Sequence, residues 1–398
     1  AIYDAVINHL QQAAQIFSAG SKEGLTSAND VYFSGDVTKW HRFANSLLLR
    51  YYMRISDKKP DIARAGIEAV YQSGIYMQTP DQDATLDYTG SSNDIWLSRN
   101  TPGSADDFQR YQACQTLIDQ LVGTNDPRLP VWFDSVRVQW VPDPNLPTAA
   151  DNIIYADGQA LDVVTYEYDK FVQLYDDVKF TRRFNPNLAS YNTGLYVGLP
   201  PGILSPDAYN GNPSPGQGRQ NQHVSQLAPI YATPGSPGDI LKARIISAAE
   251  VSFILAEASL KGWNVGDAET HYNNGIKNSM ETWGQADGYE AFMEQAEVAF
   301  DNSLERILIQ KWIASWTAAT ESFLDYRRTG YPNLQAGPEA DQEVVAVRFG
   351  YGNDEYSNNA SNLSEALENL QITPYSGALG ADSPWSKPWI IQDTGKPW

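Results

Sequence analysis

A short segment around residue 96 combines an aromatic ring with polar side chains, as a binding loop does. In "DYTGSSNDIWLSRN", Trp96 lies in a polar, glycine-containing stretch, between Asn93 and Asp94 on one side and Arg99 on the other. Such a ring suits flat, hydroxylated ligands, because it covers their apolar face while amide, carboxylate and guanidinium groups bond hydroxyls. This tryptophan joins no helical stripe, so we predict that it is exposed. A buried core position is the alternative.

A second tryptophan of this kind is Trp140 in "VQWVPDPNLP", with Asp143 and Asn145 next to it. Two proline-bearing turns flank the ring, which favours an exposed binding position. The alternation in "VRVQWV" is equally typical of a half-buried strand, which is the alternative. Weaker aromatic candidates lie in loops: Tyr155, Tyr196 and Tyr209.

Paired arginines in "ESFLDYRRTGYP" could grip an anion or close a helix. Arg327 and Arg328 fall in the last turn of an amphipathic pattern that runs from Ser303, and cations there oppose the negative end of the helix dipole. Gly330 suits the left-handed C′ position and Pro332 stops any continuation. We predict that the arginines close one long helix, with anion binding as the alternative.

Metal and catalytic templates match poorly. Asp81, Asp83 and Asp87 have the spacing of three calcium ligands, but Leu86 and Ser92 stand where the loop needs Gly and Glu. We expect no metal or other cofactor, with a structural calcium ion as the weaker alternative. The sequence has no nucleophile-elbow, phosphate-loop or dinucleotide motif, so we expect no catalytic residues and no enzyme activity. Paired carboxylates for glycoside hydrolysis stay open, because 48 acids supply many pairs.

Composition narrows the class of partner. The chain has 398 residues, of which 42% are hydrophobic, so it can bury a sizeable core. With 28 Lys+Arg against 48 Asp+Glu, its net charge of −20 makes nucleic acid and anionic membrane surfaces poor partners. Cys114 is the only cysteine and there are four histidines, which excludes an internal disulfide and disfavours a zinc site. No run of 18 apolar residues is present.

Helical periodicity dominates both ends of the chain. The segments 41–74 and 248–284 have the same layout: a helix, a polar turn, a second helix containing Gly-Ile, and a closing glycine. Each has the length of a tetratricopeptide hairpin, about 34 residues. Hairpins of this kind must stack to bury their apolar faces, so we predict a helical-hairpin scaffold.

The middle of the chain is different. Residues 198–238 contain eight prolines and seven glycines and are predicted to be loop. Segment 159–180 is compatible with a strand pair or with a helix. We therefore predict a mainly α single domain, with a tetratricopeptide-like scaffold over about 1–124 and 240–370 and a loop-rich, partly β insertion over about 125–239.

Several segments together resemble the SusD/RagB family of Bacteroidetes nutrient-binding lipoproteins, in its second SusD-like branch. The matches occur in family order along the chain: "KWHRFANSLLLRYYMRIS", "TLIDQLVGTNDPRL", "AAEVSFILAEASLKGW" with "YNNGIKNSMETWG", "QKWIASWTAATESFLDYRRTGYP" and "RFGYGNDEYSNN". They extend over essentially the whole chain.

The resemblance implies a tetratricopeptide-like scaffold with an irregular glycan-binding region, placed on the outer-membrane surface as a lid on a SusC-like TonB-dependent transporter. Its implied activity is non-catalytic binding of an oligo- or polysaccharide at the aromatic candidates named above. An α-helical glycoside hydrolase and a helical-repeat interaction scaffold are the alternatives. Family members begin with a lipoprotein signal, an acylated cysteine and a further helical segment, which do not precede Ala1. Cys114 lies within a helical pattern and cannot be the lipidated residue. We therefore expect membrane attachment only through an N-terminal lipid, as the resemblance implies.

Overall fold

The computed structural model describes residues 2–21, 24–88, 111–146, 154–156, 159–161, 179–212, 221–231 and 240–398. The chain packs into two compact units. The first comprises Ala1–Leu86, Lys242–Ala336 and Gln342–Trp398, and the second Asp87–Leu241 with Gly337–Asp341. The second unit thus begins at residue 87, well before the boundary near 125 that the loss of helical periodicity predicts.

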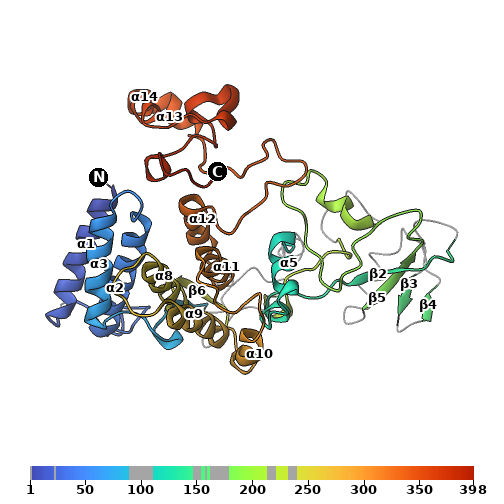
Figure 1. Ribbon diagram of the computed structural model, residues 1–398, viewed down its shortest axis with the longest axis horizontal. Helices are drawn as coiled ribbons and strands as arrows, with labels where there is room; N and C mark the ends of the chain where they lie inside the picture. The colour runs from blue at the N-terminus through green and yellow to red at the C-terminus, as the bar shows by residue number, and fades with distance from the viewer. Residues whose placement is uncertain are drawn as a thin grey trace. The chain divides into compact units, whose positions relative to one another are not determined.

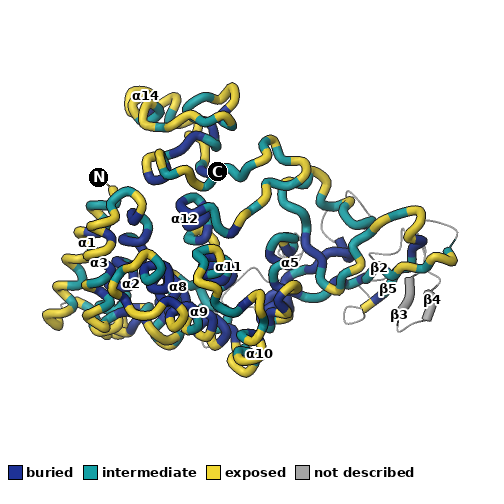
Figure 2. The backbone as a smooth tube through the Cα atoms, viewed as in Figure 1, coloured by how far each residue is buried: buried dark blue, intermediate teal, exposed yellow. Residues whose placement is uncertain are grey.

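The first unit is helical, and the prediction of a mainly α fold is confirmed (Figure 1). Its buried positions follow the inner faces of its helices (Figure 2). No helix in the described part of the chain is long and apolar enough to cross a membrane. Its α-helices are α1 (Ile2–Ser18), α2 (Val37–Arg54), α3 (Pro60–Ser73), α8 (Ala248–Leu260), α9 (Ala268–Thr282), α10 (Tyr289–Met293), α11 (Leu304–Ala314), α12 (Ala319–Thr329), α13 (Asn353–Asn358) and α14 (Ala360–Glu368).

Two helical hairpins, α2–α3 and α8–α9, repeat one packing device. A Cβ on Gly66 of α3 would come 2.3 Å from the ring of Tyr52 in α2. A Cβ on Gly275 of α9 would come 2.7 Å from the ring of Phe253 in α8. In both hairpins, therefore, a glycine on the second helix lets an aromatic ring of the first helix approach its backbone. The two Gly-Ile pairs of the sequence mark these contacts.

The hairpin helices begin and end where their sequences indicate. Pro60 is the first residue of α3, and Gly74 ends that helix in the left-handed conformation at φ 65°. Asp267 caps α9 by accepting a hydrogen bond from the Thr270 N–H at 2.8 Å. Ser247 caps α8 in the same way through the Glu250 N–H, at 3.2 Å.

Helix α8 is the centre of the first unit. It packs against α2, α9 and α11, and all its residues from Ala248 to Ala258 are buried. A helix that is buried around its whole circumference needs neighbours on every side, and these three helices supply them. The short strands β1 (Ala84–Asp87) and β6 (Lys242–Ile246) pair with each other before α8 begins.

The prediction of one long helix from Ser303 to the arginines is wrong. The chain forms α11 and α12 with a turn between them, in which Thr317 adopts φ 73°. A non-glycine residue in the left-handed region cannot continue a right-handed helix. Trp312 and Trp316, which the single stripe would place in the core, are only partly buried.

The second unit holds the predicted β structure. Its helices are α5 (Gln115–Gly123) and α6 (Leu129–Trp132), and its strands are β2 (Val138–Pro142), β3 (Ile154–Ala156), β4 (Gln159–Leu161) and β5 (Phe180–Phe184). The strands form one sheet in the order β2-β5-β3-β4, with β2 parallel to β5 and the other pairs antiparallel. Segment 159–180 begins in β4 and ends in β5, and residues 162–178 lie outside the described part.

Candidate functional site

The loop around Trp96 lies outside the described residues, together with Asn93, Asp94 and Arg99. Its role in binding stays a prediction from the sequence.

Trp140 is not an exposed platform, because its side chain is only 1% exposed. The ring lies at the centre of β2 and stacks on Tyr191, with centroids 4.1 Å apart, and on His223, at 4.6 Å. Its Nε1–H donates to the Asn210 carbonyl at 2.7 Å. Burial, together with Arg182 nearby, lowers the pKa of His223 to about 3, so the imidazole in this stack is neutral. Trp140 is therefore a core residue, as the strand alternative predicts.

The tyrosine candidates do not form an open aromatic surface either. Tyr209 packs on the apolar cluster of Val136, Val197 and Val224. Tyr196 is partly buried, and burial raises its pKa, as Asp134 does. Tyr155 pairs through its backbone with Thr181 of β5 and Ala160 of β4, while its side chain lies outside the described part. Tyr196 and Tyr209 are thus part of the packing of the second unit.

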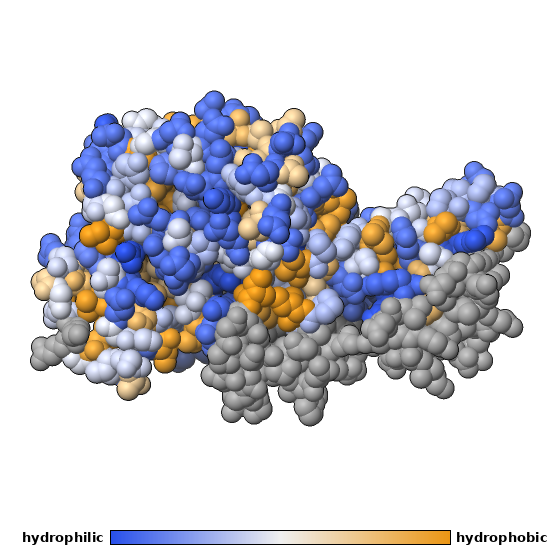
Figure 3. Space-filling model, turned by 90° about the horizontal axis from the view of Figure 1, so that it is seen from below, coloured by the Kyte–Doolittle hydropathy of each residue, from blue (hydrophilic) through white to orange (hydrophobic). Residues whose placement is uncertain are grey.

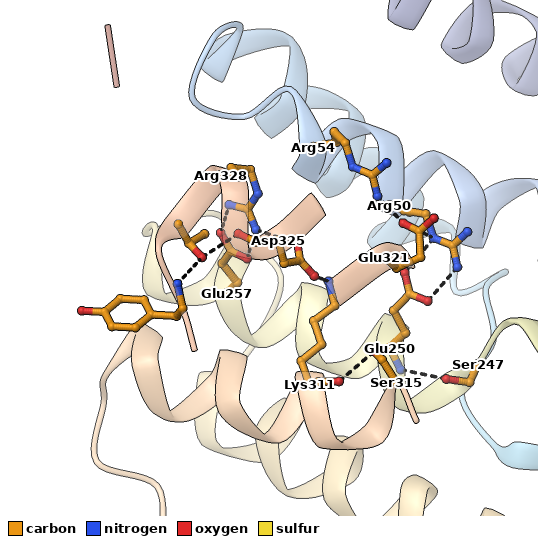
Figure 4. A network of polar contacts seen from close by, with 12 residues as sticks. Arg50, Arg54, Ser247, Glu250, Glu257, Lys311, Ser315, Glu321, Asp325 and Arg328 are labelled. Carbon is orange, nitrogen blue, oxygen red and sulfur yellow. Dashed lines mark hydrogen bonds and ion pairs between the residues drawn. The ribbon is translucent and has the colours of Figure 1, made fainter. Parts of the chain in front are cut away.

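The paired arginines at the end of α12 have structural partners. Arg328 is buried and donates from Nη1 and Nη2 to the two carboxylate oxygens of Glu257, at 2.5 and 2.7 Å (Figure 4). Its Nη2 also reaches Asp325 Oδ1 at 3.2 Å. Arg327 donates to the Val347 carbonyl at 3.0 Å, and its guanidinium lies over the ring of Phe323. Both arginines lie in the last turn of α12, before the left-handed Gly330, as the helix-closing interpretation predicts, and the charge of Arg328 is paired with Glu257 and Asp325.

Arg328 belongs to a buried ionic network that joins α2, α8, α11 and α12 (Figure 4). Lys311 Nζ lies 2.6 Å from Asp325 Oδ2. Burial would raise the pKa of Asp325, but Lys311 and Arg328 outweigh that effect and hold it below its usual value. On the other side of the network, Arg50 binds both carboxylate oxygens of Glu250 at 2.7 Å. In each of these pairs the positive and the negative charge compensate each other. The network therefore holds helices together instead of binding a ligand.

A cleft with an exposed tryptophan in its lining lies beside the C-terminal tail of the first unit. We call it the aromatic cleft: it has a volume of about 730 Å³, and its lining includes Tyr3, Lys59, Arg327, Asn369 and Trp389. The indole of Trp389 is 45% exposed, the highest value for a tryptophan in the described part. The face seen in Figure 3 is mainly hydrophilic, with hydrophobic residues gathered in separate patches.

The tail exposes this indole because its neighbours are anchored. Ile390 and Ile391, the next two residues of the 3₁₀ turn η7 (Trp389–Ile391), are buried and fix the turn to the helices. Lys58 donates from Nζ to the Gln392 carbonyl at 2.7 Å and lies 5.7 Å from the centre of the Trp389 ring. A rigid, half-exposed ring of this kind is a preformed stacking surface, since little ordering is needed when a ligand arrives.

The floor and rim of the aromatic cleft offer polar groups around the ring. Lys59 Nζ lies 2.6 Å from Asp4 Oδ1, so the rim carries an ion pair with both donors and acceptors. The backbone carbonyl of Asn369 accepts a hydrogen bond from the Gln392 side chain. The Asn369 side chain donates to the Glu365 carbonyl, which holds it at the end of α14. An aromatic face with convergent polar groups, in a cleft of several hundred cubic ångströms, is the composition of a small-ligand site.

Sequence reasoning missed this cleft. Two other tryptophans near the C-terminus are held by hydrogen bonds, since the Nε1–H groups of Trp385 and Trp398 donate to the carbonyls of Val344 and Val345. The signal that distinguishes Trp389 is "WII", in which two buried isoleucines follow a ring that then has to point outward.

No group of acidic, histidine or cysteine side chains within the described residues is arranged to hold a metal ion. Asp83, one of the three aspartates with calcium-ligand spacing, is buried and accepts a hydrogen bond from the Ala248 N–H at 2.7 Å. Burial raises its pKa to about 7. The carboxyl group of Asp83 thus accepts a hydrogen bond from the first residue of α8.

Comparison with known proteins places this architecture. Solved structures share the fold over almost the whole chain. A SusD homologue from Bacteroides uniformis is 23% identical with a TM-score of 0.66, and 98% of this chain covers 72% of that one. A protein described as chitin-binding is 22% identical, with a TM-score of 0.67 over 98% of this chain and 72% of that one. A SusD-like protein from Bacteroides thetaiotaomicron is 22% identical, with a TM-score of 0.63 over 99% of this chain and 73% of that one. No curated protein matches the sequence.

A family model covers most of the chain. The SusD-like family, described as starch-binding and associating with the outer membrane, matches residues 1–141 and 164–352. The chain belongs to this family, in the second SusD-like branch, as the sequence motifs predict. The ionic network and the two hairpins thus form the scaffold of a SusD-like protein.

Proposed function

We propose that this protein binds an oligo- or polysaccharide at the outer-membrane surface, without cleaving it, and delivers it to a SusC-like TonB-dependent transporter. The observation that carries the proposal is membership of a family described as starch-binding and associating with the outer membrane. The likeness to a protein described as chitin-binding agrees with a saccharide ligand. Attachment to the membrane would use an N-terminal lipid, as in other lipoproteins.

The aromatic cleft suits the capture step. A sugar ring stacks its apolar face on Trp389, while its hydroxyls bond the Lys59–Asp4 pair and the Asn369 amide. Each ring contact contributes on the order of 1–2 kcal/mol, so a few contacts give micromolar or weaker affinity. That range suits a protein that must release its cargo. The Trp96 loop, with Asn93, Asp94 and Arg99, is the second aromatic platform that we propose.

The aromatic cleft favours binding over hydrolysis. A glycosidase needs two carboxyl groups about 5–9.5 Å apart across the scissile bond. Among the residues that line the aromatic cleft, Asp4 is the one carboxylate, and it is already paired with Lys59. A catalytic pair is therefore not assembled around this stacking surface.

Native gels with embedded polysaccharides test the proposal. We expect the protein to be retarded by at least one glycan of a panel of starch, fructan, laminarin, mannan and chitin derivatives. Prolonged incubation with that glycan should release no reducing ends. Absence of retardation across the panel would reject saccharide binding, and released reducing ends would favour the glycosidase.

Variants then locate the platform. Trp389→Ala and Trp96→Ala should each lower the affinity measured by calorimetry about tenfold, because each removes one stacking contact. Phe349→Ala is the matched control, since that residue is 89% exposed and does not line the aromatic cleft. Normal binding by both tryptophan variants would reject these two platforms.

The transporter is tested separately. Co-purification of the full chain with a large outer-membrane barrel would support delivery and would also fit a helical-repeat scaffold that docks a partner. Purification without a barrel would contradict the delivery step and leave saccharide binding as the function.

A further inference from the structure

A second cleft, which Lys58 helps to line, differs in charge from the rest of the protein. We call it the lysine cleft: it has a volume of about 840 Å³, and its lining includes Lys58, Lys261, Trp263, Gln392, Thr394 and Lys396. Four cationic and two acidic residues line it, whereas the whole chain has 28 Lys+Arg against 48 Asp+Glu. The local balance of charge is therefore the reverse of the global one.

Two of the four cations already have acidic partners. Arg328 is bound to Glu257, as described above, and Lys261 Nζ lies 3.3 Å from Asp57 Oδ1. The ion pair with Lys261 also compensates the charge of Asp57, which lines the lysine cleft. These groups shape the wall and contribute little net charge.

The other two cations keep their charge available. Within the described part of the chain, Lys58 and Lys396 have no carboxylate at ion-pair distance. Lys58 donates one hydrogen bond, to the Gln392 carbonyl at 2.7 Å, and Lys396 Nζ lies 5.7 Å from the centre of the Tyr331 ring. An ammonium group has three donors, so both retain donors for a ligand. Charge-assisted bonds from such groups to a carboxylate or sulfate are about twice as strong as neutral ones.

Lys58 connects the two clefts. It lines the lysine cleft and lies over the ring of Trp389, which lines the aromatic cleft. The Lys58 ammonium therefore lies beside the ring on which we propose that a saccharide stacks. Trp263 gives the lysine cleft a ring for a neighbouring sugar unit, whereas the Gln392 amide and the Thr394 hydroxyl already donate to backbone carbonyls of the protein.

We propose that the lysine cleft binds the anionic groups of an acidic saccharide, such as uronate carboxylates or sulfate esters, through Lys58 and Lys396. The inference rests on the proposed function and names its substrate class. Asp393, which also lines the lysine cleft, serves as an acceptor for sugar hydroxyls. The negative net charge of the protein repels such a ligand at long range, but salt screens that repulsion beyond about 8–10 Å, so the nearby lysines decide.

Calorimetry with three galactose-based oligosaccharides of equal length tests the inference. The probes are an oligogalacturonate, a sulfated galactan and a neutral galactan, and the first two distinguish carboxylate from sulfate. We expect at least one anionic probe to bind about tenfold more tightly than the neutral one. The double variant Lys58→Met and Lys396→Met, which keeps the apolar stems, should lose that preference and bind the neutral probe as before.

Lys39→Met is the matched control, because Lys39 is an exposed lysine of α2 that lines neither cleft. It should leave the preference unchanged, and thermal unfolding should show that all variants are folded. Equal affinity for the neutral and both anionic probes overturns the inference and leaves the proposed function standing. A preference that survives in the double variant also overturns it. Failure to bind any probe or any polysaccharide of the panel rejects both.

Discussion

Arg328 at the end of α12 and Glu257 near the end of α8 form a bidentate ion pair in the interior of the helical unit, with Nη–Oε distances of 2.5 and 2.7 Å. The two residues are separated by 71 positions in the chain. Both side chains are almost completely buried, at 4% and 1% exposure. Burial lowers the pKa of an arginine, but Glu257 outweighs this and raises that of Arg328, so the pair stays charged.

Glu257→Gln should therefore destabilise the protein by about 3–5 kcal/mol, because it leaves a buried guanidinium with only Asp325 as a charged partner. Urea unfolding followed by circular dichroism measures the loss. Glu281→Gln, on an exposed position of α9, should change the free energy of unfolding by less than about 0.5 kcal/mol. A small effect at Glu257 would mean that the pair does not hold the two helices together.

Gly275→Ala tests the packing device of the hairpins. The new Cβ would meet three atoms of the Phe253 ring at 2.7–2.8 Å, so the ring or the helix has to move. We expect a loss of about 1–3 kcal/mol in the free energy of unfolding. Gly352→Ala is the control, since no atom lies within 4 Å of its Cβ position. Equal stability of the two variants would show that the close approach in α8–α9 is not required.

Asp83 should make stability depend on pH. Burial raises its pKa to about 7 in the folded protein, against about 4 in the unfolded chain. Between these values the folded state binds more protons than the unfolded state, so the contribution of Asp83 falls as pH rises from 4 to 7. Asp83→Asn keeps an acceptor for the Ala248 N–H but does not titrate.

The measurement for Asp83 is the difference in unfolding free energy between wild type and Asp83→Asn at several pH values. This difference should shift by about 1–3 kcal/mol in favour of the variant from pH 4.5 to 7.5. His223 has the opposite effect, because its pKa is lowered to about 3 in the folded protein and stability therefore rises with pH up to its ordinary pKa. This contribution is the same in wild type and variant, so it cancels in the difference. A flat difference would contradict the raised pKa.

Trp140 and Trp389 should behave in opposite ways when replaced by alanine. Trp140→Ala removes a fully buried ring from its stack on Tyr191 and should cost about 3–5 kcal/mol of stability. Trp389→Ala removes a half-exposed ring and should cost less than about 1 kcal/mol. Thermal unfolding with a saccharide titration separates the two effects. A destabilised Trp389→Ala with normal binding would make that ring structural.

Local chemistry in the sequence predicted the helical hairpins well. Pro60, Gly74 and Asp267 act within one helical turn of their own positions, so their effects can be foreseen without knowing the fold. The Gly-Ile pairs indicated hairpins because a glycine that admits a ring is a local requirement of such a unit. The break between α11 and α12 was not foreseen, since the stripe of apolar residues continues through it and only the conformation of Thr317 interrupts the helix.

The candidate site divides in the same way. The family, the helical scaffold and the presence of aromatic residues in polar segments could be predicted from the sequence alone, because these follow from periodicity, motif order and residue type. Which rings are open was decided by the tertiary structure: distant residues such as Tyr191 and His223 cover Trp140, while the burial of Ile390 and Ile391 turns Trp389 outward. Exposure depends on what the rest of the chain packs against a residue, and that information is not local.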